Sequence, residues 1–465
     1  MKIRYIIAIS ALTFSLVSCE DKLALTPEQD LTEKVIFNSP STAKSAVLGI
    51  YSTAQGLEFY GGMPQLIEEY LGDNVDFVGS FPTLQEIRDF TTITSNVSIR
   101  DIWQVHYRVI TRANKVIAQV PNVPNMETGD KDMYVGEAKF LRALAYLQLV
   151  NQFAQPYQVS QGSNLGVPLV LEDFTGEVTY PARATVNEVH AQIKKDLTEA
   201  AAVLPPTHPD GVGRATKGAA NALLARLALY REEWPAAITA ARAAIAGPYA
   251  RATDYSFYDK NTSEDVFTIQ NSATDNGRTG SGGWASFYSP TEVSGRGDGP
   301  FSASLLAAYA AEPGDKRAAL KRRGTSAEGQ GSIRDFTNKF PDATTNADNS
   351  PVIRITEVYL TLAEALAQSS AIPSAEAITI VNQLRNRAGL LPVAPLTKQA
   401  TIDAVLLERR KELAFEGFRR MDMLRYKQNL RAGNPNAAFG GARTILPIPQ
   451  RERDNNPSLE PNPGF

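Results

Sequence analysis

The sequence predicts a mainly α-helical fold, in which a scaffold of tetratricopeptide-like helical pairs carries a loop-rich ligand-binding part with a few short strands. Alanine-rich stretches place apolar residues three or four positions apart, which is the spacing of one helix face. Between them lie segments rich in glycine, proline and aromatic residues, which break this period. The chain has 465 residues and one cysteine, so its stability must come from a large apolar core and not from an internal disulfide.

The N-terminal residues have the pattern of a secretory signal. Basic residues precede an apolar run over 6–17, which is shorter than the ~20 residues that span a bilayer. The run ends in Leu-Val-Ser-Cys, and this cysteine, Cys19, resembles the lipidated cysteine of a bacterial lipobox. We therefore expect 1–18 to be a lipoprotein signal peptide and 19–38 to be a lipidated tether and docking segment. The alternative is an ordinary signal peptide with a chance cysteine.

Composition excludes one class of function. The chain carries 47 Lys and Arg against 50 Asp and Glu, and no basic stripe with interleaved aromatic residues. Nucleic-acid binding needs such a stripe to neutralise phosphates, so we expect no nucleic-acid partner. After the signal, no stretch approaches 18 uninterrupted apolar residues, so we expect membrane attachment only through the lipid anchor.

Helix signals divide the rest of the chain, 39–465, which we expect to form a single domain. Ser39-Pro40 is a helix start, and Pro121 ends a helix with a clean apolar stripe. Thr185 with Glu188 three residues later is a capping-box pattern. His106 lies on the apolar stripe and is better explained as a core histidine than as a ligand. The predicted scaffold covers about 39–56, 100–153, 185–247 and 351–430.

Two pairs of helical segments resemble tetratricopeptide units. One pair spans 213–230 and 235–246, and the other spans 353–368 and 374–388. Long insertions separate the pairs, which argues against a free-standing repeat array. The sequence instead favours a repeat-like scaffold that carries a second part built from loops.

The loop-rich part is predicted over about 57–99 and 254–350. It includes a strand candidate at 264–269 and a glycine-rich stretch at 276–299 in which aromatic residues are embedded. Such a stretch does not easily build a core, so aromatic side chains there are candidates for ligand contact, although they could also pack back onto the scaffold. The residues that we predict to bind a ligand are Trp284, Tyr288, Phe77, Phe81, Asp73 and Asn74.

Charged residues are densest over 408–420, which reads ERRKELAFEGFRR. Acidic residues in this pattern could form a catalytic cluster, but the interleaved arginines favour a structural ion network. No nucleophile or metal-ligand triad accompanies them, so we expect no catalytic residue, no metal site and no cofactor. Gly417 marks a bend, and the proline-spaced tail at 444–465 should lie extended along the body without adding a strand.

Several motifs together resemble the SusD/RagB family of nutrient-binding outer-membrane lipoproteins of the Bacteroidetes. They are the lipobox at Cys19, RITEVYLTLAEA at 354–365 with NQLRNRAGL at 382–390, ERRKELAFEGFRR at 408–420, and LPIP at 446–449 with the closing NPGF. Their order and spacing fit nearly the whole chain. The end departs from the family, which more often has Gln-Asn before Pro-Gly and a terminal tyrosine, and the chain is somewhat short.

The resemblance implies a non-catalytic protein on the outer face of the outer membrane. It would capture an oligosaccharide and act as the lid of a SusC-like TonB-dependent transporter. Sugar rings stack on aromatic faces while Asp and Asn bond their hydroxyls, which suits the six predicted ligand residues. The alternatives are a peptide or another nutrient as ligand, a surface glycoside hydrolase, and a scaffold that binds a partner protein.

Overall fold

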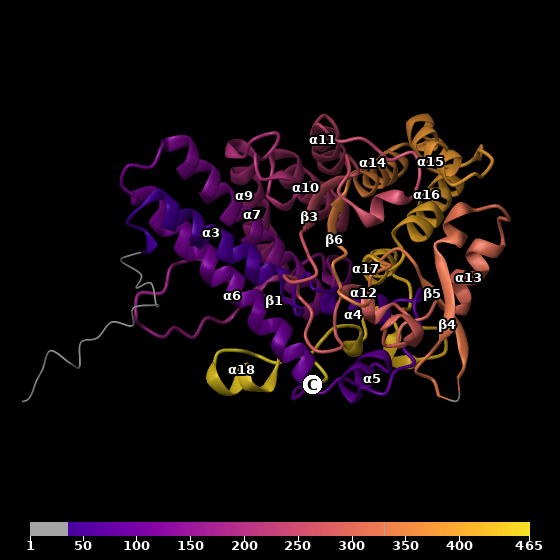
Figure 1. Ribbon diagram of the computed structural model, residues 1–465, viewed down its shortest axis with the longest axis horizontal. Helices are drawn as coiled ribbons and strands as arrows, with labels where there is room; N and C mark the ends of the chain where they lie inside the picture. The colour runs from indigo at the N-terminus through magenta and orange to yellow at the C-terminus, as the bar shows by residue number, and fades with distance from the viewer. Residues whose placement is uncertain (1–35, 330) are drawn as a thin grey trace, which may run out of the picture.

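The computed structural model describes residues 36–329 and 331–465, and it is mainly helical (Figure 1). Cys19, the predicted signal and most of the predicted tether lie outside the described residues. The helices are α3 (Pro40–Gln55), α4 (Met63–Leu71), α5 (Pro82–Arg88), α6 (Val97–Gln119), α7 (Thr128–Phe153), α8 (Tyr157–Ser160), α9 (Val186–Val203), α10 (Lys217–Tyr230), α11 (Trp234–Ile245), α12 (Trp284–Phe287), α13 (Ala303–Ala310), α14 (Ile355–Ser369), α15 (Ala375–Arg387), α16 (Lys398–Leu413), α17 (Arg419–Arg425) and α18 (Gln450–Asn455).

The scaffold is a succession of helices that pack against one another. Packing runs from α3 and α6 through α7, α9, α10 and α11 to α14, α15 and α16, and these helices form the left and upper parts of Figure 1. Small residues on α10 and α11, among them Ala219, Ala222 and Ala241, are buried at these contacts and let the helices approach closely. The predicted pairs are confirmed as α10 with α11 and α14 with α15.

The predicted helix starts are confirmed in atomic detail. The side chain of Ser39 caps α3 by accepting a hydrogen bond from the backbone N–H of Thr42. Thr185 and Glu188 form the complete capping box at the start of α9. His106 is buried as expected: its ring nitrogens lie 2.7 Å from the carbonyl oxygen of Ile102 and 2.7 Å from Oε1 of Gln148, and burial lowers its pKa to about 4.

The described strands form three antiparallel two-stranded sheets. They pair β1 (Leu165–Pro168) with β2 (Arg183–Thr185), β3 (Asp265–Ile269) with β6 (Ser350–Arg354), and β4 (Lys321–Thr325) with β5 (Ile333–Thr337). The chain makes an excursion over residues 270–349 between β3 and β6. Pairing of the two strands, with Asp265 opposite Arg354, joins the two ends of this excursion. Because every residue of β3 and β6 is buried, this pair fixes the excursion firmly against the scaffold.

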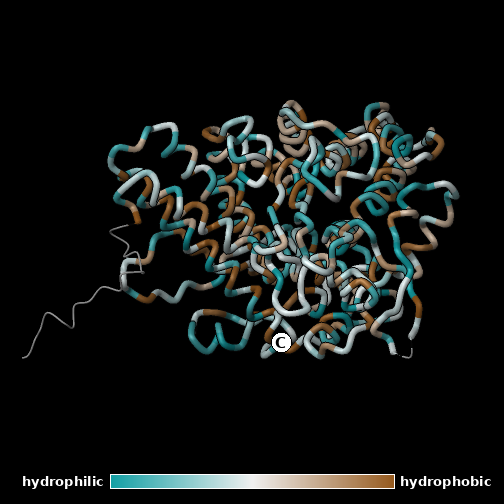
Figure 2. Tube along the Cα trace, in the orientation of Figure 1, coloured by the Kyte–Doolittle hydropathy of each residue, from teal (hydrophilic) through white to brown (hydrophobic). Residues whose placement is uncertain are grey.

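Hydrophobic segments concentrate on the scaffold helices, whereas α18 is hydrophilic (Figure 2). The predicted tail adds no strand, as expected, but it is not extended throughout, because α18 forms one short helix within it. Pro449 stands at the N-cap of α18, a position where its missing N–H costs nothing. None of the helices in the described part of the chain is long and apolar enough to cross a membrane.

Candidate functional site

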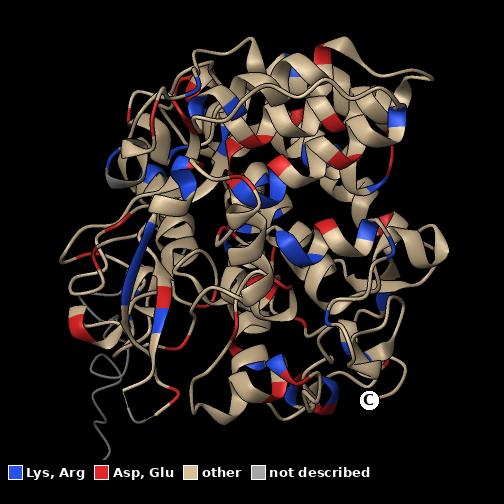
Figure 3. Cartoon of the chain, turned by 90° about the vertical axis from the view of Figure 1, so that its right-hand side faces the viewer, with Lys and Arg blue, Asp and Glu red and all other residues tan. Residues whose placement is uncertain are grey.

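The charged motif at 408–420 builds a buried cluster, which we call the ionic centre. Its members come from β3, β6, α15, α16 and the loops around them: Glu264, Arg317, Lys339, Arg354, Arg387, Glu408, Glu412 and Glu416. Representative N–O distances are 2.6 Å for Arg317–Glu408, 2.7 Å for Arg387–Glu412 and 2.8 Å for Arg354–Glu416. Figure 3 shows basic and acidic residues interleaved on these facing elements.

The electrostatics of the ionic centre argue against a role for Glu412 as a general acid. Burial alone would raise the pKa of Glu412, but Arg387, Arg354 and Arg317 outweigh it and lower the pKa to about 2. A general acid needs a pKa near the working pH, and a group held ionised in this way cannot donate a proton. The motif thus forms the buried ion network that the sequence predicts.

Lys339 explains how α16 can end inside the core. Its ammonium group donates to the backbone carbonyl oxygens of Glu412 and Ala414, at 2.7 and 2.8 Å, and to Oε1 of Glu416 at 2.8 Å. These bonds satisfy carbonyls that the end of a helix leaves without partners. The chain then turns through Gly417, whose φ of +81° is a conformation that L side chains rarely adopt, and this is the predicted bend.

The glycine-rich stretch is not the solvent-exposed loop that its composition suggests. Trp284 and Tyr288 are only 2% and 1% exposed, so neither presents a ring face to solvent. Trp284 packs edge-on against Phe340, with ring centroids 5.1 Å apart, and Tyr288 packs edge-on against Phe415 at 5.3 Å. Their role toward a ligand stays a prediction, and their position is in the core.

Glycine produces this packing by allowing close approach of the backbone. A Cβ on Gly62 would lie 3.1 Å from the Cα atom of Trp284, and one on Gly283 would lie 2.5 Å from Oδ1 of Asn346. These two glycines therefore allow Trp284 to pack beside the start of α4 and the 284–287 helix to pack against Asn346.

The other four predicted ligand residues gather around one end of α4 and the start of α5. The carboxylate of Asp73 lies between the guanidinium groups of Arg419 and Arg410, and buried Asn74 accepts a hydrogen bond from Nε of Arg410 at 2.9 Å. Burial works to raise the pKa of Asp73, but the bond from Arg419 and the charges of Arg419 and Arg410 lower it.

The two phenylalanines differ sharply in exposure. Phe77 is 2% exposed, whereas Phe81 is 50% exposed. The guanidinium group of Arg296 lies over the Phe81 ring, 4.1 Å from its centroid, and Nε of Arg296 donates to Asp298 at 2.6 Å. Arg296 therefore supports the Phe81 ring at the surface.

Next to these residues opens a cleft of about 630 Å³, which we call the loop cleft. It lies between the 76–88 segment, the β4–β5 connection and the loop after α17. Of these elements, α5, β4 and β5 are labelled in the lower right of Figure 1. Two of these three walls come from the segments that were predicted to be loop-rich. It is lined by Asp76, Phe77, Val78, Gly79, Ser80, Gln85, Arg88, Ala327, Glu328, Arg334, Arg431 and Asn434.

Arginine side chains hold the walls of the loop cleft together. Arg334 on β5 lies 3.0 Å from a carboxylate oxygen of Asp76 and 3.0 Å from one of Glu328. Arg431 donates to the backbone carbonyl oxygens of Val75, at 2.6 Å, and Tyr70, at 3.1 Å. The cleft therefore offers guanidinium, carboxylate, amide and hydroxyl groups, which is a lining suited to a polar ligand.

Sequence reasoning located this region but missed most of the residues that line it. Phe77 was predicted and lines the cleft, whereas Phe81 follows the lining residue Ser80 in the chain, and Asp73 and Asn74 shortly precede the lining residue Asp76. Arg334 and Arg431 were missed because each is far from 76–88 in the sequence and only the fold brings them together. A weak signal was present in the Arg-Ala-Gly-Asn-Pro-Asn run at 431–436, which is typical of a turn.

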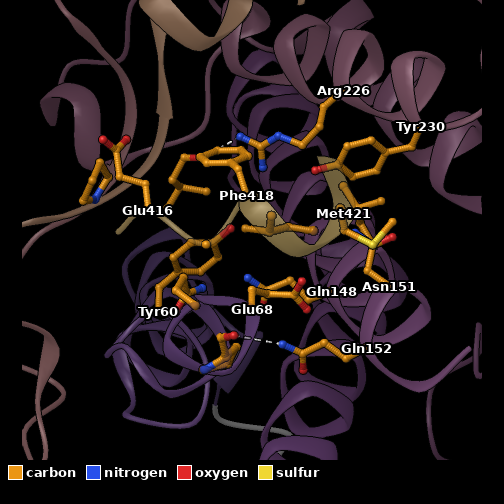
Figure 4. A pocket seen from close by; sticks show the side chains of 17 residues that line it. Tyr60, Glu68, Gln148, Asn151, Gln152, Arg226, Tyr230, Glu416, Phe418 and Met421 are labelled. Carbon is orange, nitrogen blue, oxygen red and sulfur yellow. Dashed lines mark hydrogen bonds between the residues drawn. The ribbon is translucent and has the colours of Figure 1, made fainter. Parts of the chain in front are cut away.

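A second cavity is too small for a sugar. It lies between α4, α7, α10 and the 416–421 segment, and its volume of about 50 Å³ has room for a few water molecules only. Figure 4 shows polar groups of Tyr60, Glu68, Gln148 and Arg226 pointing into it. Among the described residues there is no group of three or more His, Cys, Asp or Glu side chains that could hold a metal ion.

Comparisons with known proteins agree with this architecture. Residues 23–229 match a family described as SusD-like, starch-binding and associating with the outer membrane, and residues 313–465 match the SusD family. Together the two matches cover more than half of the chain. SusD-like protein P25 of Formosa agariphila is 26% identical over an alignment that covers 99% of this chain and 98% of the relative.

Solved structures share the fold over their full length. A SusD superfamily protein from Bacteroides vulgatus has a TM-score of 0.82 and 25% identity, with 92% of this chain and 100% of that chain covered. A putative sugar binding protein from the same species has a TM-score of 0.79 and 27% identity, with 92% and 99% covered. The helical scaffold with a loop-rich part is thus the fold of these proteins as well.

Proposed function

Because this chain belongs to the SusD/RagB family, we propose that it is a non-catalytic lipoprotein that captures a glycan in the loop cleft. It passes the glycan to a SusC-like TonB-dependent transporter and acts as the lid of that transporter. Anchoring is through Cys19, on the outer face of the outer membrane. The family description, which joins starch binding with the outer membrane, supports the ligand class and the location.

The observation that carries the ligand site is the loop cleft itself. Its volume of about 630 Å³ lies within the range of ~300–1,000 Å³ that is usual for ligand pockets, and its lining is mostly polar. The exposed ring of Phe81 beside it gives a sugar an apolar face to stack on. The densest carboxylates of the chain lie in the ionic centre, closed to a substrate, which supports binding without hydrolysis.

Isothermal titration of the mature lipoprotein, purified in detergent, against plant, algal and host polysaccharides tests this site. Ala327 is exposed at the hairpin wall of the cleft, so Ala327→Trp fills the cleft without disturbing the core. Ala243→Trp, an exposed site on α11, is the matched control. We expect heat from at least one glycan, lost in Ala327→Trp and kept in Ala243→Trp. Equal binding by both variants would place the glycan elsewhere.

Two further experiments test the anchor and the partner. Cys19→Ala should move the protein from the membrane fraction to the soluble fraction, because one or more acyl chains are what hold it there. Affinity purification of the wild-type protein should bring with it an outer-membrane barrel of the TonB-dependent class. Membrane retention of Cys19→Ala would refute the anchor, and purification without a barrel would refute the lid role.

A further inference from the structure

The loop cleft presents almost no aromatic surface from its own lining. Among the described residues that line it, Phe77 alone is aromatic, and it is 2% exposed. Its ring is covered by Tyr70, with centroids 4.8 Å apart, and by the guanidinium group of Arg88 at 5.9 Å. A neutral glycan that depends on stacking therefore finds only Phe81, at the rim.

Guanidinium groups dominate the lining instead. Arg88, Arg334 and Arg431 line the loop cleft, and Arg410 and Arg419 pair with Asp73, which precedes the lining residue Asp76 by three positions. They come from α5, β5, the loop after α17, the end of α16 and the start of α17. Three arginines from three places in the chain thus line one cleft.

The carboxylates that line the cleft, Asp76 and Glu328, are one fewer than the guanidinium groups that line it. Arg88 pairs with Asp89, and Arg334 pairs with Glu328. Asp76 is then shared by two guanidinium groups, 3.0 Å from that of Arg334 and 3.5 Å from that of Arg431.

Arg431 is the group left with the weakest compensation. Its shortest bonds go to the neutral carbonyl oxygens of Val75 and Tyr70, and its contact with Asp76 is at the outer limit of a hydrogen bond. Burial lowers the pKa of Arg431 and outweighs the opposing charges of Asp76 and Asp73. The cleft therefore keeps a local positive excess.

One of the existing carboxylates is placed where a ligand could replace it. Glu328 stands in the β4–β5 connection with its side chain 46% exposed, and it holds only Nη1 of Arg334. An exposed ion pair of this kind contributes little, so an incoming anion can take the place of Glu328 at small cost. Guanidinium groups bind planar carboxylates and sulfate oxygens through two parallel hydrogen bonds.

From this charge balance we propose that the loop cleft selects an anionic glycan, with its carboxylate or sulfate group bound by Arg334 and Arg431. This inference rests on the proposed function, since it names the ligand class of the same site. Ser80, Gln85 and Asn434 then bond the sugar hydroxyls, and Phe81 stacks on a ring at the rim.

Matched pairs of glycans test the charge directly. Oligogalacturonides are titrated against the same oligomers with their carboxylates methyl-esterified, and sulfated chondroitin against desulfated chondroitin. We expect binding of at least one anionic form. Its neutral partner should bind at least about tenfold more weakly. Binding of the anionic form should also weaken as salt rises from 50 to 500 mM, because salt screens the charges. The two pairs separate a carboxylate ligand from a sulfate ligand.

Two substitutions shift the charge in opposite directions. Arg334→Gln should weaken binding of the anionic form about tenfold or more, whereas Glu328→Gln should leave it equal or tighter, because the competing carboxylate is gone. Arg242→Gln removes the same charge as Arg334→Gln, but from an exposed position on α11 far from the cleft. It should leave glycan binding unchanged.

The outcomes separate this inference from the proposed function. Binding of neutral glycans that is lost in Ala327→Trp, with no preference for the anionic partner, would overturn the anionic specificity and keep glycan capture. No binding of any glycan would overturn both. Weaker anion binding in Glu328→Gln than in the wild-type protein would also refute the exchange of carboxylates at Arg334.

Discussion

Two regions of this protein contain the same kind of ion pair, between arginine and a carboxylate, but one region is buried and the other is open to solvent. In the ionic centre the side chains of Arg354 and Glu412 are 1% and 0% exposed, whereas in the loop cleft those of Arg334 and Asp76 are 29% and 34% exposed. Buried charges must keep their partners, because water cannot replace them. Charges that water already reaches can exchange one partner for another at little cost. The comparison teaches that accessibility, and not the density of charge, separates a structural cluster from a binding one.

The largest expected effect comes from removing a charge in the ionic centre. Glu412→Gln leaves Arg387 and Arg354 without full compensation, and we expect a loss of about 4 kcal/mol in the free energy of unfolding. Glu328→Gln in the loop cleft should cost no more than about 1 kcal/mol. Urea unfolding followed by circular dichroism measures both. Similar losses for the two variants would contradict the distinction between the buried ionic centre and the accessible loop cleft.

A second large effect separates the two kinds of aromatic residue. Trp284→Ala should lose about 3 kcal/mol of stability, because it empties a packed position against Phe340. Phe81→Ala, at a half-exposed ring, should lose about 1 kcal/mol or less and should instead weaken glycan binding. Unfolding and glycan titration of each variant give the two readouts. A stable Trp284→Ala protein that no longer binds glycan would assign Trp284 to the site after all.

An intermediate effect depends on pH, at a carboxylate between the two regions. Burial raises the pKa of Glu69 to about 7, although the backbone N–H of Gly417 donates to it at 2.9 Å. Native Glu69 then holds a proton between pH 4.5 and 7 that the unfolded chain has lost, so its contribution to stability falls as the pH rises through this window.

Glu69→Gln removes this dependence. The stability of the variant minus that of the wild-type protein should rise by up to about 3 kcal/mol between pH 5 and pH 8. Unfolding at several pH values measures the difference, which cancels the contributions of other titrating groups such as His106. A difference that is flat with pH would show that Glu69 titrates normally.

The smallest expected effect compares two glycines. Gly417 and Gly433 have similar φ values of +81° and +78°, but a Cβ on Gly417 would lie 3.0 Å from the Cα atom of Gln65, while one on Gly433 meets open space. Gly433→Ala should cost about 1 kcal/mol for backbone strain alone, and Gly417→Ala about 1 kcal/mol more. Thermal unfolding measures both. Equal costs would mean that the backbone at Gly417, beside the ionic centre, accommodates a Cβ as readily as the loop at Gly433.

Much of the fold could be predicted from local patterns. Ser39, Thr185 with Glu188, and the alanine-rich pairs of α10 and α11 each act within a few residues, so the sequence shows them directly. The short helix α18 was missed because a proline-rich tail gives no apolar period from which to infer one.

The candidate site was predictable as a region but not as a set of residues. The two loop-rich segments were expected to carry it, and both line the loop cleft. Trp284 and Tyr288 turned out to be buried, because glycine in the 276–299 stretch allows close packing as well as flexibility and composition cannot tell the two apart. Arg334 and Arg431 could not be predicted from the sequence, because only the fold brings them into contact with Asp76 from distant parts of the chain.

The central claim is that the loop cleft binds the ligand while the ionic centre holds the fold. Titration of Arg334→Gln and Glu408→Gln with the same glycan, at a temperature where both variants are folded, tests it most directly. We predict that Arg334→Gln keeps its stability and loses affinity, and that Glu408→Gln loses stability and keeps the wild-type affinity. The reverse pattern would contradict the account.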